Sequence, residues 1–131
     1  MLVYMVSFYN QFLFNCAFTI VVETLVFIFI VRSSFKISKE KLSLSRLILG
    51  GLFASSITIP WVWFVFPYFF SNTLILALAA GEFFAFAVEA VFYRSMFEMP
   101  WRRSIIISLA CNASSYFLGL LVAVALHAPV I

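Results

Sequence analysis

Four apolar stretches divide this chain, and they constrain its fold more than any other feature. They run from about residue 6 to 31, 44 to 66, 73 to 92 and 104 to 126. As an α-helix, each stretch is long enough to cross the roughly 30 Å of hydrocarbon in a bilayer. None alternates polar and apolar residues as the strands of a membrane β-barrel do. We therefore predict an all-α membrane protein, with one four-helix transmembrane domain over residues 1–131.

The composition favours the same class of protein. The chain is 66% hydrophobic and 10% charged, whereas a soluble domain is about 45–50% apolar and about 25% charged. A soluble core of 131 residues could not bury so many apolar side chains, but a lipid bilayer can surround them. The lipid bilayer is thus the first expected partner.

The positions of the basic residues predict how the helices are oriented. All eight fall in two segments: five lie between residues 32 and 46, where the first stretch ends and the second begins, and three lie between residues 94 and 103, between the third and fourth. The positive-inside rule then places both segments in the cytoplasm and both termini outside. A distribution this one-sided argues against an antiparallel dimer of dual topology. The net charge of +3 signals topology and anionic headgroups, and two short basic loops offer no groove for nucleic acid.

Three glutamates interrupt the apolar stretches. Glu23 lies in the first, and Glu82 and Glu89 lie in the third. A charged side chain at the bilayer centre costs roughly 2.5–3.5 kcal/mol on insertion scales. Residues that carry such a cost are, by default, candidates for a functional site.

A count of helical rise predicts that these glutamates lie at similar depths in the membrane. At about 1.5 Å per residue, Glu23 and Asn112 each lie roughly 13 Å from the nearest cytoplasmic arginine. Glu82 and Glu89 are seven residues apart and share a helix face. We predict one buried polar cluster that binds a ligand or an ion, formed by Glu23, Glu82, Glu89, Asn112, Thr58, Ser55 and Ser115.

The chemistry expected of this cluster follows from its lack of basic partners. Arg94 is near enough to approach Glu89, but not Glu82 or Glu23. The carboxyls must then hold protons, a monovalent or divalent cation, or water. We therefore expect a cation- or proton-coupled transport protein or a subunit of one, with Glu23, Glu82 and Glu89 as the candidate metal ligands.

Two other functions remain open. In the first, the chain is a non-catalytic subunit or scaffold, and the glutamates serve helix packing or partner binding. In the second, it is a glutamate-based intramembrane enzyme. Zinc-ligand spacing, a CxxC pair, a phosphate-binding glycine loop and a Ser-His-Asp set are all missing from the sequence. No catalytic residue is therefore assigned, and no cofactor is expected.

Two further patterns concern helix packing. Cys111, Ser115 and Gly119 follow one another at four-residue intervals, which is typical of a close helix contact. That face could pack within the bundle, against a second copy of the chain or against another membrane protein. Pro60 removes a backbone donor within the second stretch and predicts a kink there.

The polar motifs also resemble those of a protein group. They are Thr19-x-x-x-Glu23, Thr58-x-Pro60-x-x-Trp63, Glu82-x6-Glu89 and Asn112-x-x-Ser115-x-x-x-Gly119. This combination resembles short prokaryotic four-span integral membrane proteins of uncharacterised function. The resemblance implies a four-helix fold in a prokaryotic inner or plasma membrane, and it implies no activity.

The predicted orientation can be tested with a reporter fused after Ile131. Because the last apolar stretch is expected to end outside the cytoplasm, a reporter that works only in the cytoplasm should stay inactive there. A fusion in the segment around Lys39 should be active and serves as the control. An active reporter after Ile131 would contradict the number of spans or their direction.

Overall fold

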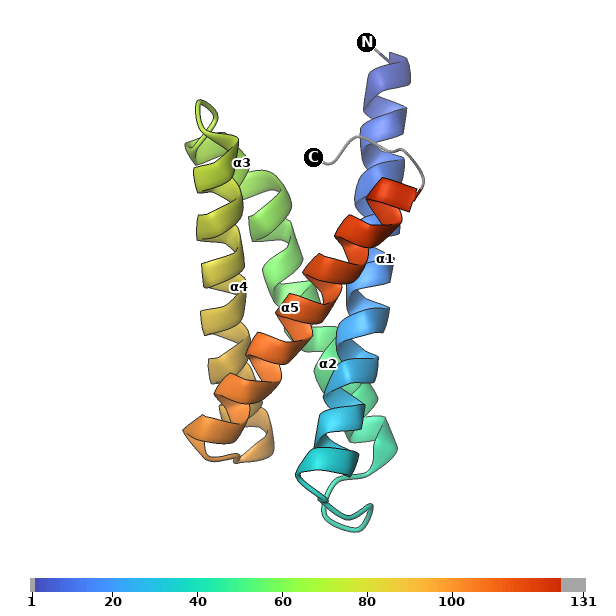
Figure 1. Ribbon diagram of the computed structural model, residues 1–131, viewed down its shortest axis with the longest axis vertical. Helices are drawn as coiled ribbons and strands as arrows, with labels where there is room; N and C mark the ends of the chain where they lie inside the picture. Colours follow the sequence, from blue (N-terminus) through green and yellow to red (C-terminus); the bar gives the residue numbers. More distant parts are fainter. Residues whose placement is uncertain (1, 126–131) are drawn as a thin grey trace.

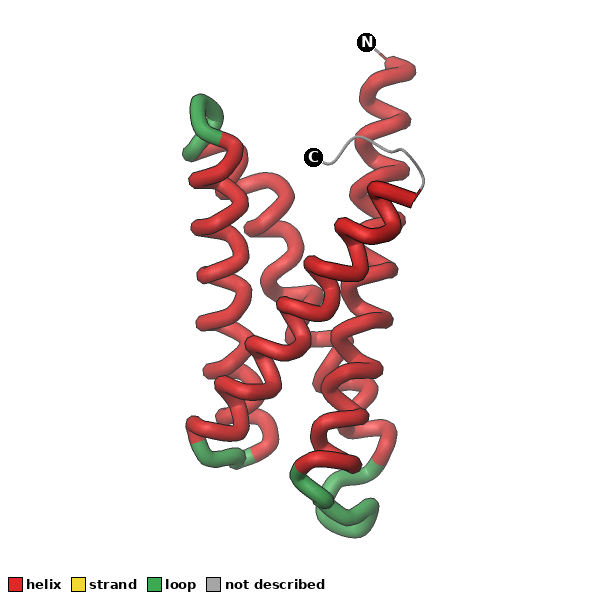
Figure 2. The backbone as a smooth tube through the Cα atoms, viewed as in Figure 1, coloured by secondary structure: helices red, strands yellow, loops and turns green. Residues whose placement is uncertain are grey.

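The computed structural model describes residues 2–125, and their side chains from residue 8 onward. Within this range every element is helical, and loops occur only where the chain reverses (Figure 2). The elements are α1 (Leu2–Phe29), η1 (Ile30–Ser34), α2 (Leu44–Pro60), η2 (Trp61–Val65), α3 (Phe66–Phe69), α4 (Leu74–Phe97) and α5 (Trp101–Ala125). The two η elements are π-helical turns that continue α1 and α2.

Four helices of the described chain are long and apolar enough to cross a membrane. These spans are Phe8–Ser34, Leu44–Phe69, Leu74–Phe97 and Trp101–Ala125. The third runs five residues past the predicted end at residue 92, and the fourth begins three residues before the predicted start at 104. Helical hydrogen bonding continues through polar residues. Hydropathy therefore locates the apolar part of a helix more accurately than it locates the residue at which the helix ends. The predicted end of the last helix, at residue 126, lies outside the described residues.

The helices pack as a ring in which α1 and α4 each contact both α2 and α5. In Figure 1, α5 crosses in front of the bundle from the base of α4 towards α1, and α2 crosses behind it in the opposite sense. The loops at residues 35–43 and 98–100 lie at one end of the molecule, and the turn at 70–73 lies at the other. Both basic segments are therefore at the same end of the bundle.

The outer surface of the bundle is apolar. Ile75, Phe83 and Leu121 are 82%, 71% and 63% exposed, and many other large apolar side chains are exposed as well. Soluble proteins rarely present contiguous apolar surface on this scale. Together with the four long apolar helices, this surface indicates an integral membrane protein.

An apolar core fills the end of the bundle that carries the basic loops. The Phe27 ring packs on Tyr93 and Phe97, with ring centroids 4.6 Å and 5.2 Å apart. Beside this core, the Arg32 guanidinium donates to the carbonyl oxygens of Ile37 (2.7 Å), Ser38 (3.0 Å) and Leu42. These bonds fold the first basic loop back against the end of its helix.

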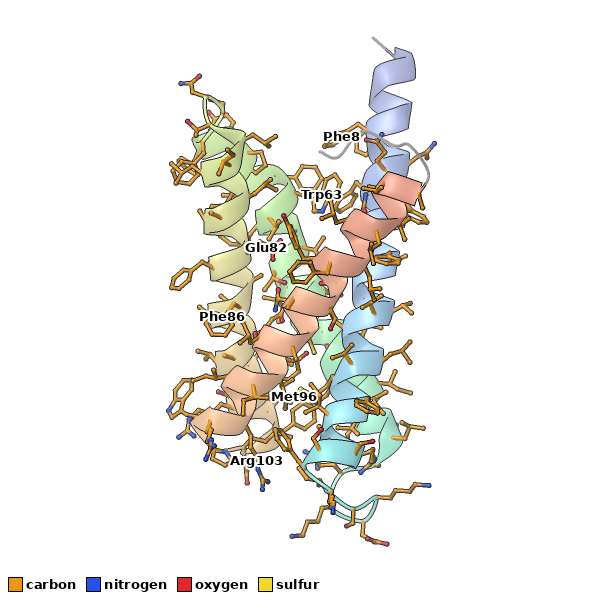
Figure 3. The ribbon with its side chains drawn as sticks, viewed as in Figure 1. Phe8, Trp63, Glu82, Phe86, Met96 and Arg103 are labelled. Atoms are coloured by element: carbon orange, nitrogen blue, oxygen red, sulfur yellow. The ribbon has the colours of Figure 1, made fainter. Side chains whose placement is uncertain are left out.

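The second span changes its helical geometry at Pro60. α2 ends there, and the next turn is π-helical, with the Phe66 N–H bonded to the carbonyl of Trp61. The missing proline N–H and such wider turns are both recognised causes of irregular helices. Beyond Pro60, Trp63 packs on Phe8 of α1 with ring centroids 6.1 Å apart (Figure 3). These rings lie at the end of the bundle opposite the basic loops.

The close approach of α1 and α2 at Gly51 generates a stability prediction. A Cβ added to Gly51 would lie 2.6 Å from Thr24 Oγ1 and 3.0 Å from Thr24 Cα. We expect Gly51→Ala to destabilise the protein by about 1–3 kcal/mol, because the two helix backbones must separate. Thermal unfolding in a fixed detergent measures the change.

Gly119→Ala is the matched control for this substitution. Its added Cβ would lie 3.9 Å from the Phe18 ring, an ordinary van der Waals distance. Alanine also favours the helix by about 1 kcal/mol over glycine, so the control should be neutral or stabilising. Equal losses from the two substitutions would contradict the packing of α1 on α2.

Candidate functional site

The first half of the site is the carboxyl of Glu23, which α1 carries into the centre of the ring. Glu23 is only 2% exposed. Its Oε2 accepts a 2.6 Å hydrogen bond from Ser55 of α2, and its Oε1 accepts a 2.7 Å bond from Ser115 of α5. Both carboxyl oxygens are thus bonded to hydroxyls from two neighbouring helices.

The second half is the carboxyl of Glu89 on α4, which is 1% exposed. Its Oε1 accepts a 3.0 Å bond from Thr58 of α2. Its Oε2 accepts a 2.6 Å bond from the Asn112 amide of α5. Glu89 therefore repeats the arrangement at Glu23, with one donor from α2 and one from α5.

The repetition arises from the spacing of the donors along their helices. Ser55 and Thr58 are three residues apart on α2, and Asn112 and Ser115 are three apart on α5. Residues at this spacing lie on one helix face, so each helix presents a pair of donors to the middle of the ring. We call Glu23, Glu89 and these four donors the carboxyl pair site.

The partners of the carboxyl pair site are neutral groups. Arg94, the nearest base along the chain, donates instead to the carbonyl oxygen of Met99 at 3.2 Å. Its guanidinium also lies 4.8 Å from the ring centre of Trp101. The possible approach of Arg94 to Glu89 is therefore not what the structure shows. Neutral donors can bond a carboxyl whether it is ionised or protonated.

Each hydroxyl of the site has a second acceptor within reach. Ser55 Oγ lies 3.1 Å from the carbonyl oxygen of Gly51, and Thr58 Oγ1 lies 3.1 Å from that of Ser55. Ser115 Oγ lies 3.1 Å from the carbonyl oxygen of Asn112. A hydroxyl has one proton to donate and lone pairs to accept with. Each one can therefore donate to its carboxylate, or donate to its own helix while accepting from a carboxylic acid.

Asn112 differs from the hydroxyls because its amide nitrogen only donates. It bonds Glu89 Oε2 and also the carbonyl oxygen of Ser108 at 3.0 Å. Ser108 in turn donates to the carbonyl oxygen of Phe86 at 2.8 Å, which ties α5 to α4. Oε2 of Glu89 is thus held as an acceptor, and Oε1 is the oxygen able to carry a proton.

Glu82 takes no part in the hydrogen bonds of the carboxyl pair site. It is half-buried, and no hydrogen-bond donor among the described residues reaches its carboxyl. It lines a groove of about 380 Å³ between α4 and α5, where Asn112 also lies. Figure 3 shows Glu82 projecting from α4 towards α5. The structure thus joins six of the seven predicted site residues by hydrogen bonds and leaves Glu82 in the adjoining groove.

The predicted metal role of Glu23, Glu82 and Glu89 stays a prediction. Among the side chains that the structure describes, no three His, Cys, Asp or Glu residues are grouped so as to hold a metal ion. Two of these carboxyls are engaged with neutral donors, and the third faces a different space. Their predicted depths alone did not determine which carboxyls join one hydrogen-bond network.

The predicted packing face on α5 contacts α1 of the same chain. Cys111 is buried, with Sγ 3.4 Å from the carbonyl oxygen of Glu23, and Ser115 bonds the Glu23 carboxyl. Gly119 lies opposite Phe18. An additional contact with another copy or partner through this face stays a prediction.

The walls of the groove were not predicted from the sequence. They are formed by Leu78, Phe83, Phe86, Leu109, Ala113 and Tyr116, together with Glu82 and Asn112. A signal was available, because Leu78 and Phe86 lie four residues before and after Glu82 and share its helix face. On α5, Leu109, Ala113 and Tyr116 follow one another at four- and three-residue steps.

No protein-family model matches the chain, and comparisons with curated proteins and with solved structures found no match either. Two buried carboxyls, three hydroxyls and one amide can bind protons, and they can also hold helices together. Proton binding requires that the carboxyls change their charge, whereas helix packing does not.

Two substitutions of Glu89 distinguish the charge states. Glutamine keeps an oxygen to accept from Asn112 and supplies an N–H to Thr58, as a protonated glutamate would. We expect Glu89→Gln to retain the unfolding temperature. Leucine leaves buried polar groups without these partners, and Glu89→Leu should lose about 1–3 kcal/mol. If Gln were as damaging as Leu, the folded state would require the ionised carboxylate.

Proposed function

We propose that this protein is a small proton-coupled membrane transport protein, or a subunit of one, in which the carboxyl pair site takes up and releases protons. The strongest support is that each hydroxyl of the site lies within hydrogen-bond distance of two acceptors, a carboxyl oxygen and a backbone carbonyl oxygen of its own helix. Both charge states of Glu23 and Glu89 can be bonded without moving a heavy atom. A site of this kind can change its protonation at little cost in packing.

The proposed exchange at Glu89 illustrates the chemistry. In the ionised state, Thr58 donates its proton to Oε1, and Asn112 donates to Oε2. When Oε1 takes up an excess proton from the surrounding solution, it becomes the donor to Thr58 Oγ1. The Thr58 proton then turns to the carbonyl oxygen of Ser55, which lies 3.1 Å away. The Asn112 bond is unchanged throughout.

Glu23 can exchange a proton at either oxygen. Ser55 can turn its own proton to the carbonyl of Gly51, and Ser115 can turn to that of Asn112. The two carboxyls are also connected, because Thr58 reaches the backbone of Ser55, and Ser115 reaches that of Asn112. Two carboxyls in one buried network favour sharing a single negative charge over holding two.

A proton suits the carboxyl pair site better than a metal ion does. All four carboxyl oxygens already accept hydrogen bonds of 2.6–3.0 Å from neutral donors. A divalent cation in proteins takes about six or more oxygen ligands that converge on one point. A proton needs only one oxygen and one acceptor, which each hydroxyl supplies.

The orientation and location of the protein are part of the proposal. The two basic loops lie at one end of the bundle, as the positive-inside rule requires for a single topology. We assign that end to the cytoplasm of a prokaryotic cell, with both termini outside the inner or plasma membrane. The carboxyl pair site then lies between the two membrane surfaces.

Proton flux into liposomes tests the proposed function. Purified protein is reconstituted around a trapped pH-sensitive dye, and the outside is acidified with valinomycin and potassium present to balance charge. We expect faster acidification than in protein-free liposomes. A Glu23→Gln/Glu89→Gln variant should fall to the protein-free rate, because an amide cannot exchange the site's proton. Glu40→Gln is the control, because Glu40 is an exposed carboxyl in the first basic loop and should not affect the flux. The Ser38 side chain holds the pKa of Glu40 below its ordinary value, so this carboxyl stays ionised.

A competing function is favoured by one observation, namely that the same hydrogen bonds connect all four spanning helices. In that case the chain is a non-catalytic subunit, and its glutamates serve helix packing. The double glutamine variant would then acidify as wild type does. Infrared spectra would also show a carboxylic-acid C=O stretch that does not change with pH. Those two results together would show that the carboxyl pair site serves helix packing and does not exchange protons.

A further inference from the structure

The groove between α4 and α5 combines an apolar wall with a single acidic side chain. Phe83, Phe86 and Tyr116 contribute aromatic rings, and Leu78 and Leu109 contribute aliphatic surface. Its volume of about 380 Å³ falls in the roughly 300–1,000 Å³ range of small-molecule sites. Glu82 is the acidic residue among its lining side chains.

Glu82 lacks the partners that satisfy the other buried glutamates. Within the described residues, no hydrogen-bond donor reaches its carboxyl. Arg94 is twelve residues away on the same helix, and its guanidinium is engaged by Met99 and Trp101. A carboxylate in such a place favours a positive charge beside it, because attraction is stronger in a low-dielectric groove than in water.

The groove opens towards the surface that faces lipid. Phe83 and Leu109 are mostly exposed, and both stand on the apolar outside of the bundle. A ligand would therefore enter through the hydrocarbon and must itself be lipid-soluble. Aromatic faces attract cations that have few water molecules to lose. These properties together describe one class of ligand.

We propose that this groove binds a lipophilic organic cation, with Glu82 as its counter-charge and the rings of Phe83, Phe86 and Tyr116 around it. This site is separate from the proton exchange proposed at Glu23 and Glu89, although Asn112 borders both. A cation in the groove would stand beside the residue that fixes Glu89. Binding can be measured without proton movement, so either proposal can fail alone.

Isothermal titration calorimetry in detergent tests the proposal with two ions of the same shape. Tetraphenylphosphonium is a lipophilic cation, and tetraphenylborate is an anion of matching geometry. Titrations into protein-free micelles are subtracted. We expect the phosphonium to bind and the borate to show no binding, because Glu82 repels it.

Variants then assign the binding to the groove. Glu82→Gln keeps the shape of the side chain, and we expect its Kd for tetraphenylphosphonium to rise about tenfold or more. Phe86→Leu keeps the charge but removes one ring, and its Kd should rise about two- to fivefold. Glu98→Gln changes a carboxyl at the basic end of the bundle and should bind as wild type does.

Two results would overturn the proposal. One is an unchanged Kd for tetraphenylphosphonium in Glu82→Gln. The other is equal binding of tetraphenylborate and tetraphenylphosphonium, which would mean that the groove recognises only the shape and hydrophobicity of the ion. Gel filtration and circular dichroism of each variant confirm that it is folded, and Phe86→Leu provides a second reading that leaves Glu82 intact.

Discussion

The hydrogen bonds around two buried carboxyls are the interaction on which the arrangement of the bundle depends. Glu23 enters from α1 and Glu89 from α4, and each accepts one bond from α2 and one from α5. In hydrocarbon there is no hydrophobic force to draw helices together, so packing and such bonds determine which faces meet. Two of the four donors lie on α2 and two on α5, and all four must point towards the carboxyls. This requirement fixes the rotation of α2 and α5 about their own axes.

Close backbone packing surrounds these bonds and makes them possible. Gly51 brings α2 against Thr24 of α1, one residue along from Glu23. On the other side, Cys111 of α5 reaches the backbone carbonyl of Glu23. A larger residue at either place would push its helix away from the carboxyl. The small residues therefore serve the polar site as well as the packing.

The crossing of α5 over the bundle separates two environments for glutamates on one helix. α5 lies against α4 near the basic loops and diverges from it towards α1 at the other end (Figure 1). Glu89 is at the level where the two helices are close, so Asn112 bonds it. Glu82 is two turns farther along α4, where the same pair of helices borders a groove. One carboxyl is enclosed by donors, and the other lines the groove.

The sequence alone determined the four spans, the two basic loops and the identity of the polar residues. Those features depend on hydropathy, charge and helical periodicity, which are local properties of the chain. It also predicted that Glu82 and Glu89 share one helix face, because they are seven residues apart. Only the tertiary structure decided that Glu89 joins Glu23 while Glu82 does not. The reason is that helix crossing angles and axial rotations depend on how all the faces pack together, and positions counted along each helix leave both undetermined.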